Sequence, residues 1–290
     1  PEFSAVMGTA ASMNYASVIT HSDGDLKVTA VVTAGVTGNA ACAGDPAGWR
    51  EENGNWEPVN PQSGTINTML LISHDVTEGA LARAVLTMCE AKSAALTRLA
   101  VSSLYSQELA TGTGTDQFCV AAAVQGATPL TSASPHSILG QMIGTAVRDA
   151  TLEALRWQNG LEPSYTRGIF HALSRYGLKE ASIFEDLKPL LTERSLALLR
   201  QNSKAVFYEP MVGSAAYAIA AVLDRIRYET LPASIARGAL RHQAACLAVA
   251  LSAKPSAWPE FYTSLPEPDV EKPASLVLAA IARGWESKWI

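Results

Sequence analysis

The sequence has 290 residues, of which 48% are hydrophobic and 17% are charged, and its mean hydropathy is +0.10. A chain with this much apolar material can bury a sizeable core, so disorder over most of its length is excluded. Residues 1–158 carry 7 Lys and Arg against 14 Asp and Glu. That balance has the wrong sign for a nucleic-acid or polyphosphate site in this part of the chain.

The sequence predicts a soluble cytoplasmic protein with neither a membrane nor a nucleic-acid partner. No basic segment followed by an apolar segment opens the sequence, so no export signal is expected. The longest uncharged apolar run, Met211–Leu223, is too short to span a bilayer and predicts a buried helix. Four widely spaced cysteines argue against a zinc site or a disulfide framework, and each is expected to be a small buried residue: Cys42, Cys89, Cys119 and Cys246.

The first elements along the chain are predicted to be strands. The segment "YASVITHSDGDLKVTAVVTAG" is typical of a β-hairpin, with Asp23-Gly24 at a turn that needs positive φ angles. Residues 36–64 are rich in Gly, Pro and Asn, and we expect a long loop without structure of its own. Its tryptophans, Trp49 and Trp56, make it a candidate flap. A third strand is predicted over Gly64–Ser73.

A helix is predicted over residues 78–99, with Thr77 as its N-cap. Lys92 falls in the middle of the apolar stripe of this helix, whereas Glu90 points roughly 160° away from it. A lysine in that position snorkels to solvent, extends to a partner carboxylate, or lines a site. These three interpretations remain open from the sequence.

The segment "ELATGTGTDQFCV" then places threonines and glycines directly before Asp116 and a predicted strand. Glycines allow several backbone N–H groups to point the same way, an arrangement suited to an anion or a developing oxyanion. The segment lacks the Gly-Lys-Ser/Thr ending of a P-loop, which favours recognition of a carbonyl or amide over phosphate. The alternative is a loop that enters a strand, in which the threonines satisfy local backbone groups.

A second helix is predicted over residues 136–157, capped by Ser134 with Pro135 at its first position. His136 would then lie in the first turn, where the helix dipole favours a neutral imidazole that can accept a proton. Thr65 and Asn67 are predicted to share one face of the strand that they begin. Asp45, before a proline, is either a base or a turn residue.

After residue 158 the sequence predicts helices only, over approximately 165–176, 181–202, 212–227, 233–253 and 273–288. A proline-rich stretch, residues 254–273, separates the last two. The expected fold is therefore α+β over residues 1–158, with a mixed sheet backed by two helices, followed by a mainly α-helical region over 159–290. The sequence assigns no role to that region and specifies no oligomeric state, although a homodimer is compatible with it.

Five ordered segments resemble the adenosylcobinamide amidohydrolase family: "TAVVTAGVTGNAACAGD", "GTINTMLLIS", "EGALARAVLTMCEAKSAAL", "YSQELATGTGTDQFCVA" and "HSILGQMIGTAV". The resemblance extends from about Val6 to Leu155. Members of that family generally carry more sequence upstream of the point where this one starts, and the helical region lies outside the resemblance.

The resemblance implies hydrolysis of the amide that joins aminopropanol to the corrin ring, giving adenosylcobyric acid for cobalamin salvage. It implies no nucleoside triphosphate and no cofactor or metal held by the protein, because the cobalt enters with the corrinoid. Some bacterial members also accept pseudocobalamin. Two other functions remain open: a corrinoid-binding protein without catalysis, and an amidohydrolase of an unrelated small molecule.

Amide hydrolysis requires a nucleophile, donors for the oxyanion, and an acid for the leaving amine. We expect Asp116 or His136 to act as the base, and Lys92 either to hold Asp116 ionised or to stabilise negative charge. The nucleophile is water or a threonine hydroxyl (Thr65, Thr113 or Thr115), and water is favoured because the sequence pairs no hydroxyl with a base. The expected substrate-binding residues are Asn39, Asp45, Thr65, Asn67, Glu90, Thr111, Gly112 and Gly114.

Overall fold

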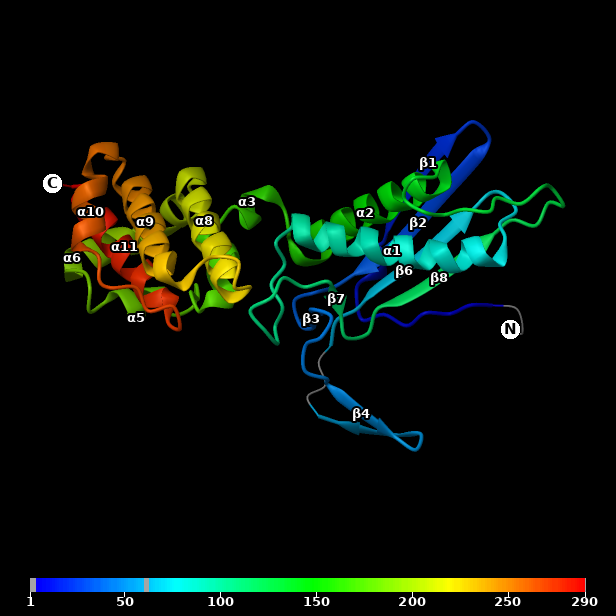
Figure 1. Ribbon diagram of the computed structural model, residues 1–290, viewed down its shortest axis with the longest axis horizontal. Coiled ribbons are helices and arrows are strands. Elements are labelled where there is room, and N and C mark those ends of the chain that lie inside the picture. Colours follow the sequence, from blue (N-terminus) through cyan, green and yellow to red (C-terminus); the bar gives the residue numbers. More distant parts are fainter. Residues whose placement is uncertain (1–3, 60–62, 290) are drawn as a thin grey trace. The chain divides into compact units, whose positions relative to one another are not determined.

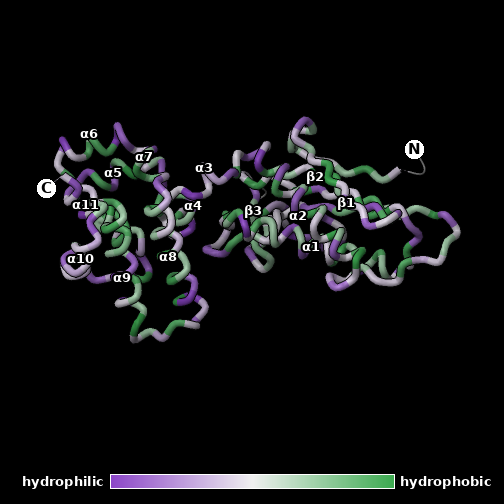
Figure 2. The backbone as a smooth tube through the Cα atoms, turned by 90° about the horizontal axis from the view of Figure 1, so that it is seen from above, coloured by the Kyte–Doolittle hydropathy of each residue, from purple (hydrophilic) through white to green (hydrophobic). Residues whose placement is uncertain are grey.

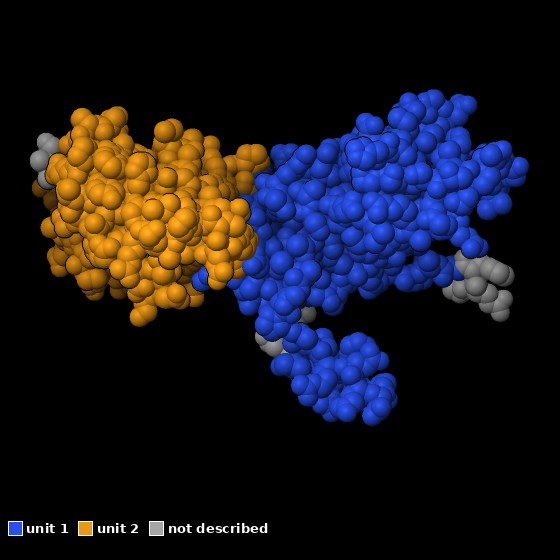
Figure 3. Space-filling model, in the orientation of Figure 1, with its two compact units in different colours: residues 1–162 blue, residues 163–290 orange. Residues whose placement is uncertain are grey.

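The computed structural model describes residues 4–59 and 63–289, which form two compact units, Pro1–Glu162 and Pro163–Ile290 (Figure 3). Each unit has its own hydrophobic core. Among the described helices, none combines the length and the apolar character needed to cross a lipid bilayer.

The first unit contains a four-stranded mixed sheet, as the sequence predicts (Figure 1). Its strands lie in the order β1 (Ser17–Asp23), β2 (Leu26–Ala34), β6 (Ile66–Ile72) and β8 (Gln117–Ala122). The first three are antiparallel neighbours, and β8 pairs with β6 in parallel. Because Asp23 pairs with Leu26, the turn residues are Gly24 and Asp25, one position later than predicted. Gly24 has the positive φ of 56° that the turn needs.

Two long helices cover the sheet, α1 (Glu78–Arg98) and α2 (Ile138–Asn159). Alternate residues of β2 supply fully buried apolar side chains, which gives the core between sheet and helices. Both helices alternate between hydrophobic and hydrophilic positions, as expected for elements that bury one face (Figure 2).

The two helices begin at caps of the same kind. The Thr77 hydroxyl accepts the Ala80 N–H, which confirms the predicted start of α1. The predicted start of α2 is wrong, because Ser137, not Ser134, is its N-cap and accepts the Gly140 N–H. The carbonyl of Ser134 accepts the Ser137 N–H in a turn before the helix. Pro135 and His136 therefore precede α2 and do not form its first turn.

The segment 36–64 is not the structureless loop that its composition predicts. β3 (Ala40–Ala41) pairs with β7 (Gly112–Thr113), and β4 (Trp49–Glu52) pairs with β5 (Asn55–Pro58) in a hairpin. The hairpin turn consists of Asn53 and Gly54, with φ angles of 52° and 78°. An Asn-Gly pair is a strong hairpin signal, so the sequence did contain the information that identifies this turn.

The second unit is helical throughout its described residues, apart from its connecting segments. Its α-helices are α3 (Pro163–Thr166), α4 (Ile169–Leu173), α5 (Ile183–Leu187), α6 (Glu193–Gln201), α7 (Ser203–Phe207), α8 (Pro210–Arg227), α9 (Ala233–Ser252), α10 (Trp258–Ser264) and α11 (Pro273–Ser287). Short 3-10 helices complete the described residues: η1 (Met13–Tyr15) in the first unit, then η2 (Ser174–Tyr176) and η3 (Pro255–Ala257).

Local breaks correct several predicted helices of this unit. The stretch 181–202 is two helices, because Pro189 cannot continue α5 and Thr192 caps α6 by accepting the Ser195 N–H. The proline-rich stretch contains α10, since Pro259 occupies a first-turn position that tolerates proline. The apolar run Met211–Leu223 lies in α8, as expected of a helix, but Met211 is exposed.

The prediction that the four cysteines are buried is also wrong. Cys42, Cys89, Cys119 and Cys246 are all half-buried.

Candidate functional site

An ion pair between α1 and the start of β8 forms the centre of the site. Lys92 Nζ lies 2.5 Å from Asp116 Oδ2, and the two side chains are 10% and 8% exposed. The helical spacing of α1 places Lys92 on the same buried face as Met88 and Ala95, and its ammonium is directed to Asp116. The ammonium also lies 5.3 Å from the centre of the Phe118 ring. Of the three interpretations that the sequence leaves open for Lys92, two apply: it extends to a partner carboxylate, and it lines a cavity.

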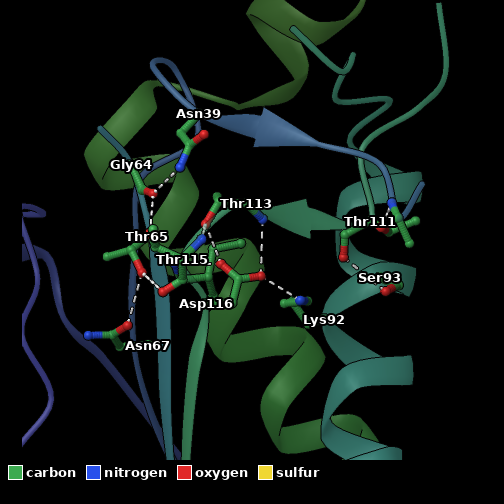
Figure 4. Close-up of polar contacts among 12 residues, drawn as sticks. Asn39, Gly64, Thr65, Asn67, Lys92, Ser93, Thr111, Thr113, Thr115 and Asp116 are labelled. Atoms are coloured by element: carbon green, nitrogen blue, oxygen red, sulfur yellow. Dashed lines mark hydrogen bonds and ion pairs between the residues drawn. The ribbon is translucent and has the colours of Figure 1, made fainter. Parts of the chain in front are cut away.

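Asp116 receives hydrogen bonds from three segments of the chain (Figure 4). Oδ1 accepts the Thr113 hydroxyl at 2.5 Å and the Ile66 N–H at 2.9 Å. Oδ2 accepts the Lys92 ammonium and the Thr113 N–H at 3.1 Å. Four donors compensate the carboxylate for the water lost on burial, so it is held in one position. The Thr113 hydroxyl is thereby paired with a carboxylate.

Gly112 is glycine because the ion pair occupies the space of a side chain. A Cβ at this position would clash with Asp116 Oδ2 and with Lys92 Nζ. The adjacent Ser93 hydroxyl donates to the Thr111 carbonyl at 3.0 Å, and Thr111 Oγ1 accepts the Ala43 N–H at 2.9 Å. These contacts attach the threonine–glycine segment to α1 and to the residues after β3.

A second network holds the other end of the segment. The Gly64 carbonyl accepts the Asn39 Nδ2–H at 3.0 Å and the Thr115 hydroxyl at 2.8 Å. Asn39 Oδ1 accepts the Tyr105 hydroxyl at 2.7 Å, so both ends of the Asn39 amide are fixed. Gly64 has a φ of 150°, and a Cβ there would approach the Asn39 side chain to 3.0 Å. The close approach of Asn39 therefore favours glycine at position 64, and the Gly64 carbonyl in turn fixes the Asn39 amide.

Thr65 and Asn67 support this network from the beginning of β6. The Thr65 hydroxyl lies 2.8 Å from the Thr115 carbonyl and 3.1 Å from Asn67 Oδ1, which confirms that the two residues share a face. Asn67 Nδ2 donates to the Gly8 carbonyl at 2.6 Å. Both side chains are buried. They position the loop and do not line the neighbouring cavity.

A cavity of about 580 Å³ opens beside the ion pair, a size typical of small-molecule sites. Its wall combines the ion pair, the threonine–glycine segment, β3 with the residues after it, and the two tryptophans of the β4–β5 hairpin. The lining residues with polar side chains or aromatic rings are Asn39, Asp45, Trp49, Trp56, Lys92, Tyr105, Thr111, Thr113, Thr115 and Asp116. Gly112 and Gly114 line it through their backbone.

Asp45 contributes a second carboxylate to the cavity. Its Oδ2 accepts the Cys42 N–H at 2.6 Å and the Ser103 hydroxyl at 2.5 Å. Partial burial favours the neutral form, but hydrogen bonds from Ser103, Ser106 and the Cys42 amide outweigh it and lower the pKa of Asp45 from its ordinary value. Asp45 is thus a turn residue that also lines the cavity, where its carboxylate is a hydrogen-bond acceptor.

His136 and Glu90 are not among the residues that line the cavity. His136 is exposed in the turn before α2, because the helix begins later than predicted. Glu90 is exposed on the opposite side of α1 from Lys92 and pairs with Arg83 at 3.5 Å. The geometry therefore joins neither residue to the ion pair.

The structure adds residues that the sequence did not single out, above all Tyr105 and Ser103. Both lie between α1 and β7, in a segment without a periodic pattern, so only their tertiary contacts identify them. Within residues 4–59 and 63–289, no group of three or more His, Cys, Asp or Glu side chains is arranged to hold a metal ion.

Comparisons with known proteins agree with the first unit. The family model for adenosylcobinamide amidohydrolase (CbiZ) matches residues 1–163. An uncharacterized protein of Methanocaldococcus jannaschii is 32% identical over 168 residues, which are 54% of this chain. The chain spans 65% of the length of that relative. No solved structure matches. Since the family model covers more than half of the sequence, the chain belongs to the adenosylcobinamide amidohydrolase family.

Proposed function

We propose that this chain hydrolyses the amide between aminopropanol and the corrin ring of adenosylcobinamide, releasing aminopropanol and adenosylcobyric acid. Family membership supports the substrate. One observation supports this reaction. At the wall of one cavity, the Thr113 hydroxyl donates to Asp116, and Asp116 pairs with Lys92. A nucleophile, a base and a group that orients the base are the parts that acyl transfer requires.

In the proposed first step, Thr113 Oγ1 attacks the amide carbonyl carbon while its proton passes to Asp116 Oδ1. The sequence favours water as the nucleophile because it pairs no hydroxyl with a base, and the 2.5 Å contact supplies that pairing for Thr113. Lys92 holds the carboxylate in place from its other oxygen. The Gly114 N–H donates no hydrogen bond within the described part of the chain, which leaves it for the developing oxyanion.

In the proposed second half, Asp116 returns its proton to the amine nitrogen as the carbon–nitrogen bond breaks, and aminopropanol leaves. Water then attacks the resulting Thr113 ester, Asp116 takes its proton, and that proton returns to Thr113 Oγ1 as the carboxylic acid departs. No redox change occurs, and no protein-bound cofactor enters. The cobalt is part of the substrate.

Polar groups around the cavity suit a substrate that carries carboxamides and a hydroxyl. Asp45 is an acceptor for amide N–H groups, and Asn39 and Tyr105 are held in fixed orientations by one another. The Thr111 and Thr115 side chains add hydroxyls along the same wall. His136 and Glu90 have no part in the proposal, because neither lines the cavity.

The test compares Thr113→Val with Thr113→Ser, using Thr145→Val as the control, because Thr145 lies on α2 and does not line the cavity. Purified protein is incubated with adenosylcobinamide, and adenosylcobyric acid is measured by mass spectrometry. Thr113→Val should lower kcat at least about a hundredfold, whereas Thr113→Ser should retain substantial activity. Acid quenching should trap a corrinoyl ester on the peptide containing residue 113.

Full activity of Thr113→Val would show that water is the nucleophile. Binding of adenosylcobinamide without hydrolysis by the unaltered chain would indicate a corrinoid-binding protein. Absence of both binding and hydrolysis would direct the search to a different small amide.

A further inference from the structure

The β4–β5 hairpin places both of its tryptophans on one face. In its register Trp49 pairs with Pro58 and Glu51 pairs with Trp56. Because opposed residues share a face and neighbours along a strand alternate, Trp49, Glu51, Trp56 and Pro58 lie on one face. Arg50, Glu52, Asn55 and Glu57 lie on the other. We call the first set the tryptophan face.

The tryptophan face is directed to the cavity of the proposed active site. Trp49 and Trp56 both line that cavity, and none of the four residues of the opposite face does. The two tryptophans are diagonal neighbours across the hairpin, a spacing at which large aromatic side chains act together.

The two tryptophans are exposed for large hydrophobic residues. Trp49 is 45% exposed and Trp56 is 62% exposed. In the view of Figure 3 the hairpin stands apart from the remaining residues of the first unit. Exposed tryptophans at the mouth of a cavity leave an apolar surface in water, which favours a ligand that covers it.

Resting on the proposed function, we infer that the tryptophan face binds the corrin macrocycle and directs its aminopropanol arm to Thr113. The macrocycle is a broad, largely apolar ring whose polar carboxamides lie at its edge. Such a ring matches two adjacent indoles, and its edge amides match Asp45 and Asn39 on the neighbouring wall. In this inference the tryptophans bind the ring, while Thr113 and Asp116 carry out the chemistry.

This division predicts a specific kinetic result. The double variant Trp49→Ala/Trp56→Ala should raise KM for adenosylcobinamide roughly tenfold to a hundredfold, with kcat changed less than about threefold. Replacement by smaller aromatic residues, Trp49→Phe/Trp56→Phe, should restore most of the affinity. Trp157→Ala removes an exposed tryptophan that does not line the cavity and should change neither constant.

Calorimetric binding separates the ring from the other parts of the substrate. Dicyanocobinamide keeps the macrocycle and lacks the adenosyl group, and the double alanine variant should bind it more weakly by the same factor. An effect confined to adenosylcobinamide would assign the tryptophans to the adenine ring and overturn the inference. Unchanged binding of both compounds would overturn it as well.

The failure of the inference is distinct from the failure of the proposed function. If the unaltered chain hydrolyses the substrate but the tryptophan variants keep their KM, the function stands and the inference fails. If the unaltered chain binds dicyanocobinamide through the tryptophans without any hydrolysis, the inference stands and the function fails. If it binds no corrinoid, both fail.

Discussion

The two members of the buried ion pair should contribute unequally to stability. Lys92→Met removes one of the four donors to Asp116 and leaves three, from Ile66 and from two atoms of Thr113. Asp116→Ala instead leaves all four donors without their acceptor. Breaking a buried pair typically costs about 3–5 kcal/mol, and each unsatisfied buried group costs roughly 1–3 kcal/mol.

Because three donors still hold Asp116, Lys92→Met should lower the free energy of unfolding by about 2–4 kcal/mol, near the lower end of the range for a broken buried pair. Asp116→Ala should lose about 5 kcal/mol, although water from the cavity will satisfy some of its stranded donors. The double variant should lose less than the sum of the two by about 1–3 kcal/mol, because the pair is coupled.

Native-state hydrogen exchange at the slow amides of β2 and β6 measures this loss in the full chain, because it reports on the first unit alone. Arg83→Met is the control, since it breaks an exposed ion pair on the same helix and should cost under about 1 kcal/mol. Equal losses for Lys92→Met and Asp116→Ala, or strict additivity in the double variant, would refute the reasoning.

Three further outcomes follow from the same geometry. Gly112→Ala should abolish most activity because its Cβ displaces the ion pair, whereas Gly144→Ala, with open space around the added Cβ, should leave kcat unchanged in the same assay. The lowered pKa of Asp45 gives stability that is fully present above the unfolded value near 3.8 and lost as pH falls through the folded value. Asp45→Asn should therefore flatten the acid limb of a thermal-unfolding series, and an unchanged limb would contradict this. Tyr105→Phe removes the donor to Asn39 Oδ1 and should raise KM more than it lowers kcat, so a selective loss of kcat would count against a positioning role.

The sequence alone determined the parts of the fold that depend on local backbone preferences and periodicity. The Val- and Thr-rich run of β2 and the Thr77 cap were each readable in a short window. The position of Lys92 was also predictable, because helix geometry places it on the buried face of α1. Five ordered motifs indicated the family, which the family model shows.

Local signals failed where two of them competed within a few residues. Ser134 and Ser137 are both good caps, and the helix begins after the later one, which leaves His136 outside the helix. In the second unit, Pro189 broke a periodic pattern that otherwise continued for twenty residues. The spacing of apolar residues identifies the buried face of a helix, but it does not identify the residue at which the helix ends.

Only the tertiary structure decided which groups meet. Lys92, Asp116 and Ile66 come from different elements, and their convergence depends on the parallel pairing of β8 with β6 beside α1. The same packing brings Asn39 to Tyr105 and excludes Glu90, although Glu90 lies only two residues from Lys92. Local backbone geometry, which the sequence predicts, sets the face on which each side chain lies. Which distant residue that side chain meets depends on how the helices and strands pack together.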